Sequence, residues 1–355
     1  MTSPLLKPVT LGALNLRNSL VMAPLTRARG TGTDNRTPND LMAEYYEQRA
    51  SAGLILTEAT AVTPMGVGYA KTPGIWSEEQ TEGWKKITSR VHAKGGVIML
   101  QLWHVGRISH SMFLNGEAPV APSAVQAKGH VSLVRPVVEY SMPRALDLSE
   151  IPGIVEAYRK GAENAKVAGF DGVELHAANG YLLDQFLQDG TNKRTDQYGG
   201  SIENRARLLL EVTDAAISVW GADRVGVHLA PRCDSHDVSD SNPKALFGYV
   251  AEELEKRKIA FIFTREHLAD DSLTPEMKKK FKGPVIGNEK LTVPAAEELL
   301  LSGHVDAISF GKAYIANPDL VERVAAKAEL NELVPQTIYT EDGTGYTDYP
   351  FMTKK

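Results

Sequence analysis

The chain has 355 residues, of which 43% are hydrophobic, a proportion that allows a large buried core. Its formal net charge of -5 gives no basis for binding nucleic acid, and its single cysteine, Cys233, cannot form an internal disulfide. No apolar run is long enough to cross a bilayer, and the first residues lack the pattern of a signal peptide. We therefore expect a single cytoplasmic domain over residues 1–355, with no nucleic-acid or membrane partner.

In chain order, eight short apolar segments alternate with helical patterns. Each segment ends in polar or glycine-rich residues, and they cover 19–24, 53–59, 96–103, 169–176, 224–231, 259–266, 283–289 and 306–312. Apolar residues at three- and four-residue intervals predict helices between them, such as 78–94, 151–168 and 202–220. This alternation is typical of an α/β fold, and eight strands in a chain of this length favour a single (β/α)8 TIM barrel. A doubly wound open sheet is the alternative, but no Gly-x-Gly-x-x-Gly turn follows the first strand.

Three segments interrupt the regular alternation. Residues 9–16 have the pattern of a short N-terminal hairpin that would plug the bottom of the barrel. Residues 104–147 form a long loop excursion after strand 3, and a barrel loop of this length is typical of a functional segment. The last segment, 335–355, is expected to pack back onto the barrel.

Three hydrogen-bonding side chains lie at or just after the C-terminal end of the fourth strand. His176 and Asn179 supply two donors for a carbonyl-like oxygen, and Tyr181 supplies a phenolic proton. In a barrel these residues lie on the face where such folds carry out catalysis. A core histidine and a turn asparagine are the alternative for an isolated pair, but the ends of the other strands favour a catalytic role.

Those other strand ends predict a cofactor site. The first strand ends near Thr26 and the third carries Gln101, and such side chains suit a flat heterocycle with mixed donors and acceptors. The glycine-bearing ends at Asn288 and Gly311 suit a phosphate, to which Lys312 would add a positive charge. We therefore expect a cofactor that contains both a ring and a phosphate.

Several motifs resemble one family closely. The chain is similar to the old yellow enzyme family of FMN-dependent ene-reductases, and within it to the bacterial branch of N-ethylmaleimide, pentaerythritol tetranitrate and glycerol trinitrate reductases. The motifs that carry this resemblance run nearly end to end and occupy residues 22–27, 101–104, 194–201, 203–205, 314–320 and 345–350.

The resemblance implies specific binding residues. It implies that FMN is held non-covalently by Pro24, Leu25, Thr26, Ala59, Gln101, His228, Gly287, Asn288, Gly311, Lys312 and Tyr339. It also implies that the substrate pocket is formed by Thr26, Tyr69, Trp103, His176, Asn179 and Tyr181. The 194–205 motif is interpreted as structural, because its arginines and Asp196 suit the fastening of a loop onto the fourth helix.

The reaction that the resemblance implies has two halves. NADPH or NADH reduces the flavin, and an α,β-unsaturated carbonyl or nitro compound then receives the hydride from flavin N5. His176 and Asn179 would polarise the substrate oxygen, and Tyr181 would protonate the α-carbon. Nitrate esters are a further candidate substrate, and relatives include both monomers and homodimers.

Two positions depart from the usual family pattern. His228 stands where most relatives have arginine or lysine, so we hypothesise that its titration near its ordinary pKa, about 6.5, affects the reduced flavin. Lys312 stands where arginine is common, which predicts weaker binding of the phosphate. The loop over 234–240 is interpreted as solvated, without a functional role.

Two other functions remain open from the sequence. One is a flavin-free barrel that binds or isomerises a phosphorylated metabolite, using the same phosphate end. The other is a flavin-binding sensor without turnover. Neither explains why His176, Asn179, Tyr181 and Gln101 occur together.

Overall fold

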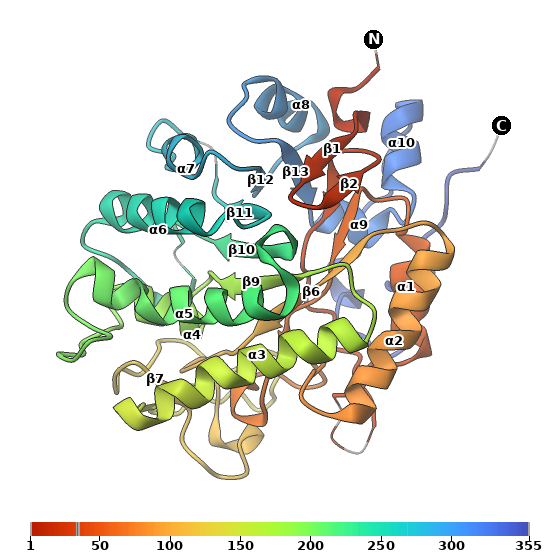
Figure 1. Ribbon diagram of the computed structural model, residues 1–355. Helices are drawn as coiled ribbons and strands as arrows, with labels where there is room; N and C mark the ends of the chain where they lie inside the picture. Colours follow the sequence, from red (N-terminus) through yellow and green to blue (C-terminus); the bar gives the residue numbers. More distant parts are fainter. Residues whose placement is uncertain (1, 33, 35, 234, 268, 354–355) are drawn as a thin grey trace.

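A closed ring of eight parallel strands forms the centre of the molecule (Figure 1). The computed structural model describes residues 2–32, 34, 36–233, 235–267 and 269–353. In ring order the strands are β3 (Leu20–Met22), β4 (Leu54–Leu56), β6 (Ile98–Trp103), β9 (Val173–Ala177), β10 (Val225–Leu229), β11 (Phe261–Arg265), β12 (Val285–Asn288) and β13 (Ala307–Phe310). Pairing of β4 with β6, and of β13 with β3, closes the ring. The predicted (β/α)8 barrel is confirmed.

Helices cover the outside of this ring (Figure 1). They are α1 (Asp40–Gln48), α2 (Glu78–Ala93), α3 (Ile151–Val167), α4 (Leu182–Leu187), α5 (Ile202–Trp220), α6 (Pro243–Arg257), α7 (Thr274–Phe281), α8 (Val293–Leu301), α9 (Lys312–Ala316) and α10 (Leu320–Ala326). Side-chain caps fix their starts: Ser77 and Gln80 form a capping box at α2, and Ser201 caps α5. The helix α3 has no such cap and instead has Pro152 in its first turn. All three helices named from the sequence begin at the predicted residues.

Alternation along each strand divides the barrel into an outer and an inner side. Val173 and Leu175 of β9 face the surrounding helices, so Glu174 and His176 face the interior. The lower interior is apolar and contains Met99, Phe261 and other hydrophobic residues. The upper interior, by contrast, is lined with polar side chains. This is the end of the barrel at which the C-terminal ends of the strands lead into loops.

The N-terminal hairpin closes the apolar end. Strands β1 (Val9–Leu11) and β2 (Leu14–Leu16) pair antiparallel, and their buried leucines join the lower interior cluster. Gly12 makes the tight turn with a φ of 56°, and an added Cβ would lie 2.2 Å from the carbonyl oxygen of Asp223. The backbone N–H of Ala13 donates to that same oxygen at 2.9 Å. The predicted plug is therefore present at the bottom of the barrel.

The excursion after β6 folds over the opposite end. It contains the short parallel strands β7 (Val120–Ala121) and β8 (Arg144–Ala145), while β5 (Thr60–Ala61) extends the ring sheet beside β6. Val105, Ile108 and Tyr140 of this excursion pack in one cluster with Trp103. The excursion therefore forms a wall above the polar end of the barrel.

The C-terminal segment packs against the start of the barrel, as predicted. The Arg27 guanidinium lies against the rings of Tyr45 and Tyr346, and its Nη2 donates to the carbonyl oxygen of Gly345 at 2.6 Å. Tyr45 and Tyr346 stack with ring centroids 4.1 Å apart. Within the described residues, no helix is both long enough and apolar enough to span a bilayer.

Candidate active site

The end of β9 and the turn that follows it bring three predicted residues together. His176 is the last inward-facing residue of β9 and is 4% exposed. Asn179 and Gly180 follow with φ values of 59° and 76°, so two successive left-handed residues reverse the chain. Tyr181 immediately precedes α4, and its ring lies 5.0 Å from the His176 ring at an angle of 85°. The left-handed turn therefore explains how one short sequence supplies three neighbouring side chains.

Trp103 and Tyr69 complete an aromatic wall around these residues. Trp103 is buried, and its ring centroid lies 5.5 Å from Tyr69 and 5.0 Å from Tyr181. The Tyr69 and Tyr181 hydroxyls are 2.9 Å apart, within hydrogen-bond distance. The structure thus brings Tyr69, Trp103, His176 and Tyr181 into contact, as the predicted substrate pocket requires.

A series of buried, hydrogen-bonded polar side chains lies beneath this aromatic wall. Gln101 Nε2 donates to Glu174 Oε2 at 2.7 Å and lies 3.1 Å from His228 Nδ1. Since Nε2 is a donor, His228 Nδ1 accepts, which leaves the proton of the neutral ring on Nε2. The His228 ring stacks on the His176 ring at 4.9 Å. Gln101 and His228 therefore lie together, one layer deeper than the aromatic wall, and their contact with a flavin stays a prediction.

Burial changes the protonation of these polar side chains. Burial raises the pKa of the Glu174 carboxyl to about 8, and the Gln101 hydrogen bond only partly offsets that shift. Burial, with Arg265 and His236 nearby, lowers the pKa of His176 to about 3. The pKa of His228 is lowered well below its usual range, mainly by burial and further by His176 and Arg265. Both histidines are therefore neutral at pH 7, and the expectation that His228 titrates near pH 6.5 is wrong for this pocket.

Sequence reasoning missed Glu174 entirely. It lies within the segment interpreted as a buried strand, where an acidic residue is unusual. The available signal was its spacing, because Glu174 is two residues before His176 and so faces the same side of the strand.

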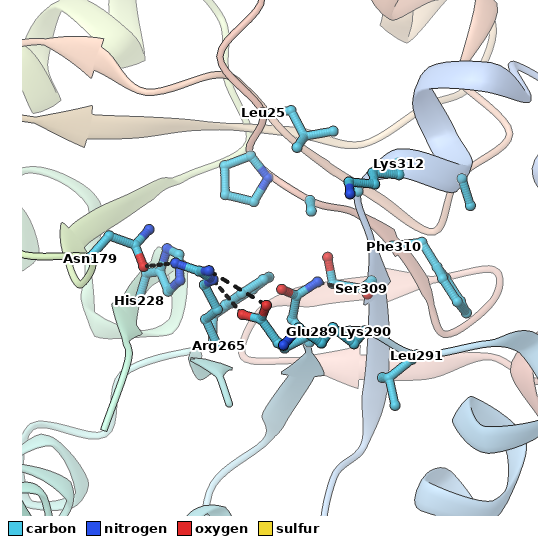
Figure 2. Close-up of a pocket in the computed structure, with 16 residues that line it drawn as sticks. Leu25, Asn179, His228, Arg265, Glu289, Lys290, Leu291, Ser309, Phe310 and Lys312 are labelled. Atoms are coloured by element: carbon cyan, nitrogen blue, oxygen red, sulfur yellow. Dashed lines mark hydrogen bonds and ion pairs between the residues drawn. The ribbon is translucent and has the colours of Figure 1, made fainter. Parts of the chain in front are cut away.

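A cavity of about 520 Å³ opens beside His228 at the ends of β11, β12 and β13 (Figure 2). Its wall includes six residues predicted to bind a cofactor, Pro24, Leu25, His228, Asn288, Gly311 and Lys312. Asn288 Nδ2 donates to the carbonyl oxygen of Ser309 at 2.9 Å, which fixes the amide across the two strand ends. Lys312 is exposed at the rim. Pro24 and Leu25 follow β3, and Gly311 and Lys312 follow β13, two strands that the closed ring makes neighbours.

The remaining predicted cofactor residues do not line this cavity directly. Gly287 faces outward, since an added Cβ would meet Val305 and Leu299, so only its backbone is available. Ala59 packs beside Trp103, and Thr26 is half-buried after β3. Tyr339 lies in the C-terminal segment and is 47% exposed, so a contact with a ring remains a prediction.

The loop after β10 contributes more than the sequence indicated. Residue 234 lies outside the described residues, but His236 is half-buried and packs on Tyr181 with ring centroids 5.1 Å apart. Its Nδ1 is 2.6 Å from the Asn179 carbonyl oxygen, and its Nε2 is 3.4 Å from the Tyr69 hydroxyl. Arg107 Nη2 donates to the carbonyl oxygen of His236 at 2.8 Å and so holds the loop in place. The interpretation as a solvated loop without a role is therefore wrong for His236.

The 194–205 motif is structural, as predicted. Arg194 pairs with Asp196 at 2.6 Å and donates to the carbonyl oxygens of Pro122 and Leu146. Arg205 pairs with Asp240 and also donates to the carbonyl oxygen of Leu187. These contacts fasten loops around the barrel mouth and leave the pocket residues free. In the part of the chain that the structure describes, no group of three or more potential metal ligands is found.

Residues 4–331 match the model of the NADH:flavin oxidoreductase / NADH oxidase family. The chain belongs to this family. It is 41% identical over 377 residues to 12-oxophytodienoate reductase 7 of Oryza sativa subsp. japonica, covering 99% of this chain and 95% of that protein. It is 42% identical over 360 residues to a probable flavin mononucleotide-dependent alkene reductase of Leishmania infantum, covering 98% and 97%.

Solved structures give the same assignment. Morphinone reductase in complex with tetrahydroNAD superposes with a TM-score of 0.94 at 48% identity, covering 98% of each chain. The old yellow enzyme homologue from Zymomonas mobilis gives a TM-score of 0.95 at 46% identity, covering 98% of this chain and 99% of that one. The protein is therefore an FMN-dependent, NAD(P)H-linked oxidoreductase of the old yellow enzyme family. The flavin-free metabolite barrel is excluded.

The polar atoms around the cavity fit FMN. His228 Nε2, His176 Nδ1 and Ser309 Oγ are buried and have no hydrogen-bond partner among the described residues. Such orphaned atoms are costly unless a ligand or water pairs with them. A flat, polar ring near His228 with a phosphate toward Lys312 would satisfy this arrangement.

Proposed function

We propose that this old yellow enzyme family member reduces the activated C=C bond of α,β-unsaturated carbonyl or nitro compounds. NADPH or NADH is the proposed reductant. The observation that carries the proposal is the contact of His176 with Tyr181 in one aromatic pocket, while Asn179, from the turn between them, lines the adjoining cavity suited to FMN. FMN, when bound, accepts hydride from the nicotinamide and returns it to the substrate.

His176 and Asn179 are proposed to bind the substrate oxygen. Negative charge grows on this oxygen during reduction, so preorganised donors aimed at it stabilise the transition state. His176 donates as a neutral imidazole, because its pKa of about 3 keeps it uncharged at physiological pH. The Asn179 side-chain amide supplies the second donor. Binding by these two groups is therefore expected to be insensitive to pH between about 5 and 8.

Tyr181 is proposed to protonate the α-carbon. Burial raises the pKa of its phenol above the usual range, so the hydroxyl keeps its proton at neutral pH. Its hydrogen bond to the Tyr69 hydroxyl offsets part of this shift and fixes the direction of the hydroxyl. Tyr181 is thus a proton donor held ready beside the site where the oxygen would bind.

The other assigned residues are proposed to hold FMN. Gln101 and His228 would face the pyrimidine edge, Thr26 and Ala59 the ring, and Tyr339 would approach the ring from the C-terminal segment. Asn288, Gly311 and Lys312 would bind the phosphate, with Pro24, Leu25 and the Gly287 backbone beside it. We expect Lys312→Arg to bind FMN more tightly, since a guanidinium pairs with two phosphate oxygens. An unchanged FMN dissociation constant in this variant would contradict that role for Lys312.

We further propose that the whole chain, 1–355, acts as one FMN-binding domain. Nitrate esters present a similar oxygen pattern and are proposed as additional substrates, which would fit the bacterial nitroester-reductase branch. The single cysteine fits a cytoplasmic enzyme, and it would work as a monomer or homodimer.

The visible absorbance of the FMN-loaded protein tests the proposal. Under anaerobic conditions, NADPH should bleach the flavin bands, and 2-cyclohexenone should restore them. Bleaching that no enone, nitroalkene or nitrate ester reverses would contradict the proposed substrates and favour a flavin-binding sensor. NADH in place of NADPH, in a parallel titration, identifies the preferred reductant.

A further inference from the structure

Arg265 connects the substrate side of the site to the cofactor side. It is the last residue of β11 and faces the cavity, because Phe261 and Phe263 at two-residue intervals face the barrel interior. Its Nη1 donates to Asn179 Oδ1 at 2.7 Å, and its Nε donates to Glu289 Oε2. Figure 2 shows these contacts as one continuous chain from Asn179 through Arg265 to Glu289.

This contact determines which end of the Asn179 amide faces the pocket. A guanidinium has only donors, so the end of the amide that meets Arg265 must be the carbonyl oxygen. The amide nitrogen then points away from Arg265, as Figure 2 shows. A substrate oxygen that gains negative charge needs a donor, and the Arg265 contact presents that donor.

Arg265 also places a positive charge behind this donor. It lowers the pKa of both His176 and His228, so its charge is felt on both sides of the stacked imidazoles. Its side chain is 32% exposed, and that of its partner Glu289 is 19% exposed. Glu289 holds the guanidinium from the far side and has a left-handed backbone, with a φ of 112°. A glutamate in that conformation is uncommon, which indicates that surrounding contacts fix it.

We propose that Arg265 is a positioning residue for the reduction, which fixes the Asn179 amide with its N–H groups toward the substrate oxygen, and that Glu289 in turn fixes Arg265. This inference rests on the proposed function. Two other roles are possible outcomes of the test: Arg265 could serve cofactor binding alone, or it could serve only as the counter-ion of Glu289.

The experiment measures ligand binding separately from turnover. The probe is tetrahydroNAD, whose carboxamide oxygen is an acceptor of the type that His176 and Asn179 are proposed to bind. Its dissociation constant is measured by absorbance titration of the FMN-loaded, oxidised protein. The variants are Arg265→Met, Arg265→Gln and Glu289→Gln. Arg257→Met is the matched control, because Arg257 forms a similar ion pair with Asp214 on the outside of the barrel.

If Arg265 acts through Asn179, the variants should show a specific pattern of tetrahydroNAD affinities. Losing the charged hydrogen bond in Arg265→Met should weaken tetrahydroNAD binding about tenfold. In an Asn179→Ala background the same substitution should cost almost nothing further, because the amide that Arg265 positions is absent. Arg265→Gln keeps a donor and should recover part of the loss. The same variants should lower kcat for 2-cyclohexenone while leaving the FMN dissociation constant within about threefold.

Several results would overturn the proposal. Equal weakening by Arg265→Met with and without Asn179 would show that the two side chains act independently. A change in FMN affinity alone would assign Arg265 to the cofactor, and no change in any ligand affinity would leave it as a counter-ion. Failure of the wild-type enzyme to reduce 2-cyclohexenone would instead contradict the proposed function, while the tetrahydroNAD titration would still decide the coupling.

Discussion

Burial raises the pKa of two side chains around the site, Tyr181 and Glu174, with different consequences. Tyr181 faces the pocket, so its retained proton is available to a substrate. Glu174 lies one layer deeper, fully buried, with Oε1 unpartnered among the described residues. Its retained proton affects the stability of the barrel and the hydrogen bonding of Gln101 instead. The same physical cause thus acts on catalysis in one case and on folding in the other.

Tyr181→Phe tests the catalytic case. Removing the proton donor should lower kcat for 2-cyclohexenone by about 10²-fold, while reduction of the flavin by NADPH stays unchanged. Stopped-flow measurement of the two half-reactions separates these effects. Tyr249→Phe, at a half-buried helix position away from the pocket, is the control. Equal losses in both half-reactions would point to a disturbed pocket instead.

Glu174→Gln tests the stability case. Between the ordinary carboxyl pKa of 4.5 and the folded value of about 8, the unfolded chain ionises Glu174 and the folded protein does not. Wild-type stability therefore falls as pH rises through this window, and the glutamine variant lacks that loss. The difference in unfolding free energy should grow by about 1.4 kcal/mol per pH unit. Urea unfolding of the apoprotein at pH 5, 6, 7 and 8 measures it, and parallel pH curves for the two proteins would rule it out.

Sequence reasoning could locate His176, Asn179 and Tyr181 because all three follow one strand within six residues. It could not locate Arg265, at the end of β11, or Glu289, just after β12, because Arg265 meets Asn179 and Glu289 meets Arg265 only after the ring closes. Glu174 was missed because the strand was recognised from its apolar residues alone, and no role was considered for the polar residue between them. In the barrel, that residue faces the polar upper interior.

At the scale of elements, the turn between β9 and α4 sets the geometry of the site. Gly180 is left-handed, and an added Cβ would lie 2.9 Å from both the His236 Cβ and the Ser235 carbonyl oxygen. The β9–α4 turn and the loop after β10 are therefore in close contact. A change in either one should move the other, together with the Asn179 backbone that joins them through His236.

Gly180→Ala should therefore destabilise the enzyme by about 1–3 kcal/mol, from backbone strain and contact with the loop. It should also weaken tetrahydroNAD binding, because Asn179 is the adjacent residue. Gly153→Ala in α3 is the control, since its Cβ would meet nothing within 4 Å and a helix favours alanine. Urea unfolding and ligand titration of both variants give the comparison. Similar stability in the two variants would show that the turn tolerates a side chain.

Elements with strong local signals were predictable to within a residue or two. A 3.6-residue periodicity marks α2, α3 and α5, side-chain caps add to it at α2 and α5, and the predicted hairpin matches β1 and β2. The 234–240 loop carries no such signal, because its charged residues suit solvent equally well. Its position over Tyr181 depends on Arg107, which comes from the long excursion 104–147.

At the scale of the whole molecule, the C-terminal segment and the region just after β3 form one structural unit. Tyr346 is fully buried, stacks on Tyr45 and lies under the guanidinium groups of Arg27 and Arg29. Arg27 immediately follows Thr26, which is proposed to contact FMN. If Thr26 contacts FMN as proposed, the C-terminal segment supports that contact through Arg27.

Tyr346→Ala should cost about 3 kcal/mol or more of unfolding free energy, since it leaves a cavity and removes the ring on which the Arg27 and Arg29 guanidinium groups lie. FMN affinity should fall as well, because Arg27 loses a fixed position. Phe351→Ala, at a side chain that is 52% exposed, should leave both quantities nearly unchanged. Thermal unfolding and FMN titration provide the measurements. A stable variant with normal FMN affinity would mean that the tail does not support the site.

The pairing of β13 with β3 also affects how the protein is made. Synthesis on the ribosome proceeds from the N-terminus. Strand β3 can therefore pair with β13 only after almost 290 further residues have been synthesised. The cofactor cavity joins Leu25 to Gly311 and Lys312, and it exists only after that meeting. A nascent or truncated chain therefore has no complete place for FMN. Uptake of the yellow cofactor would report that translation had reached the end of the barrel.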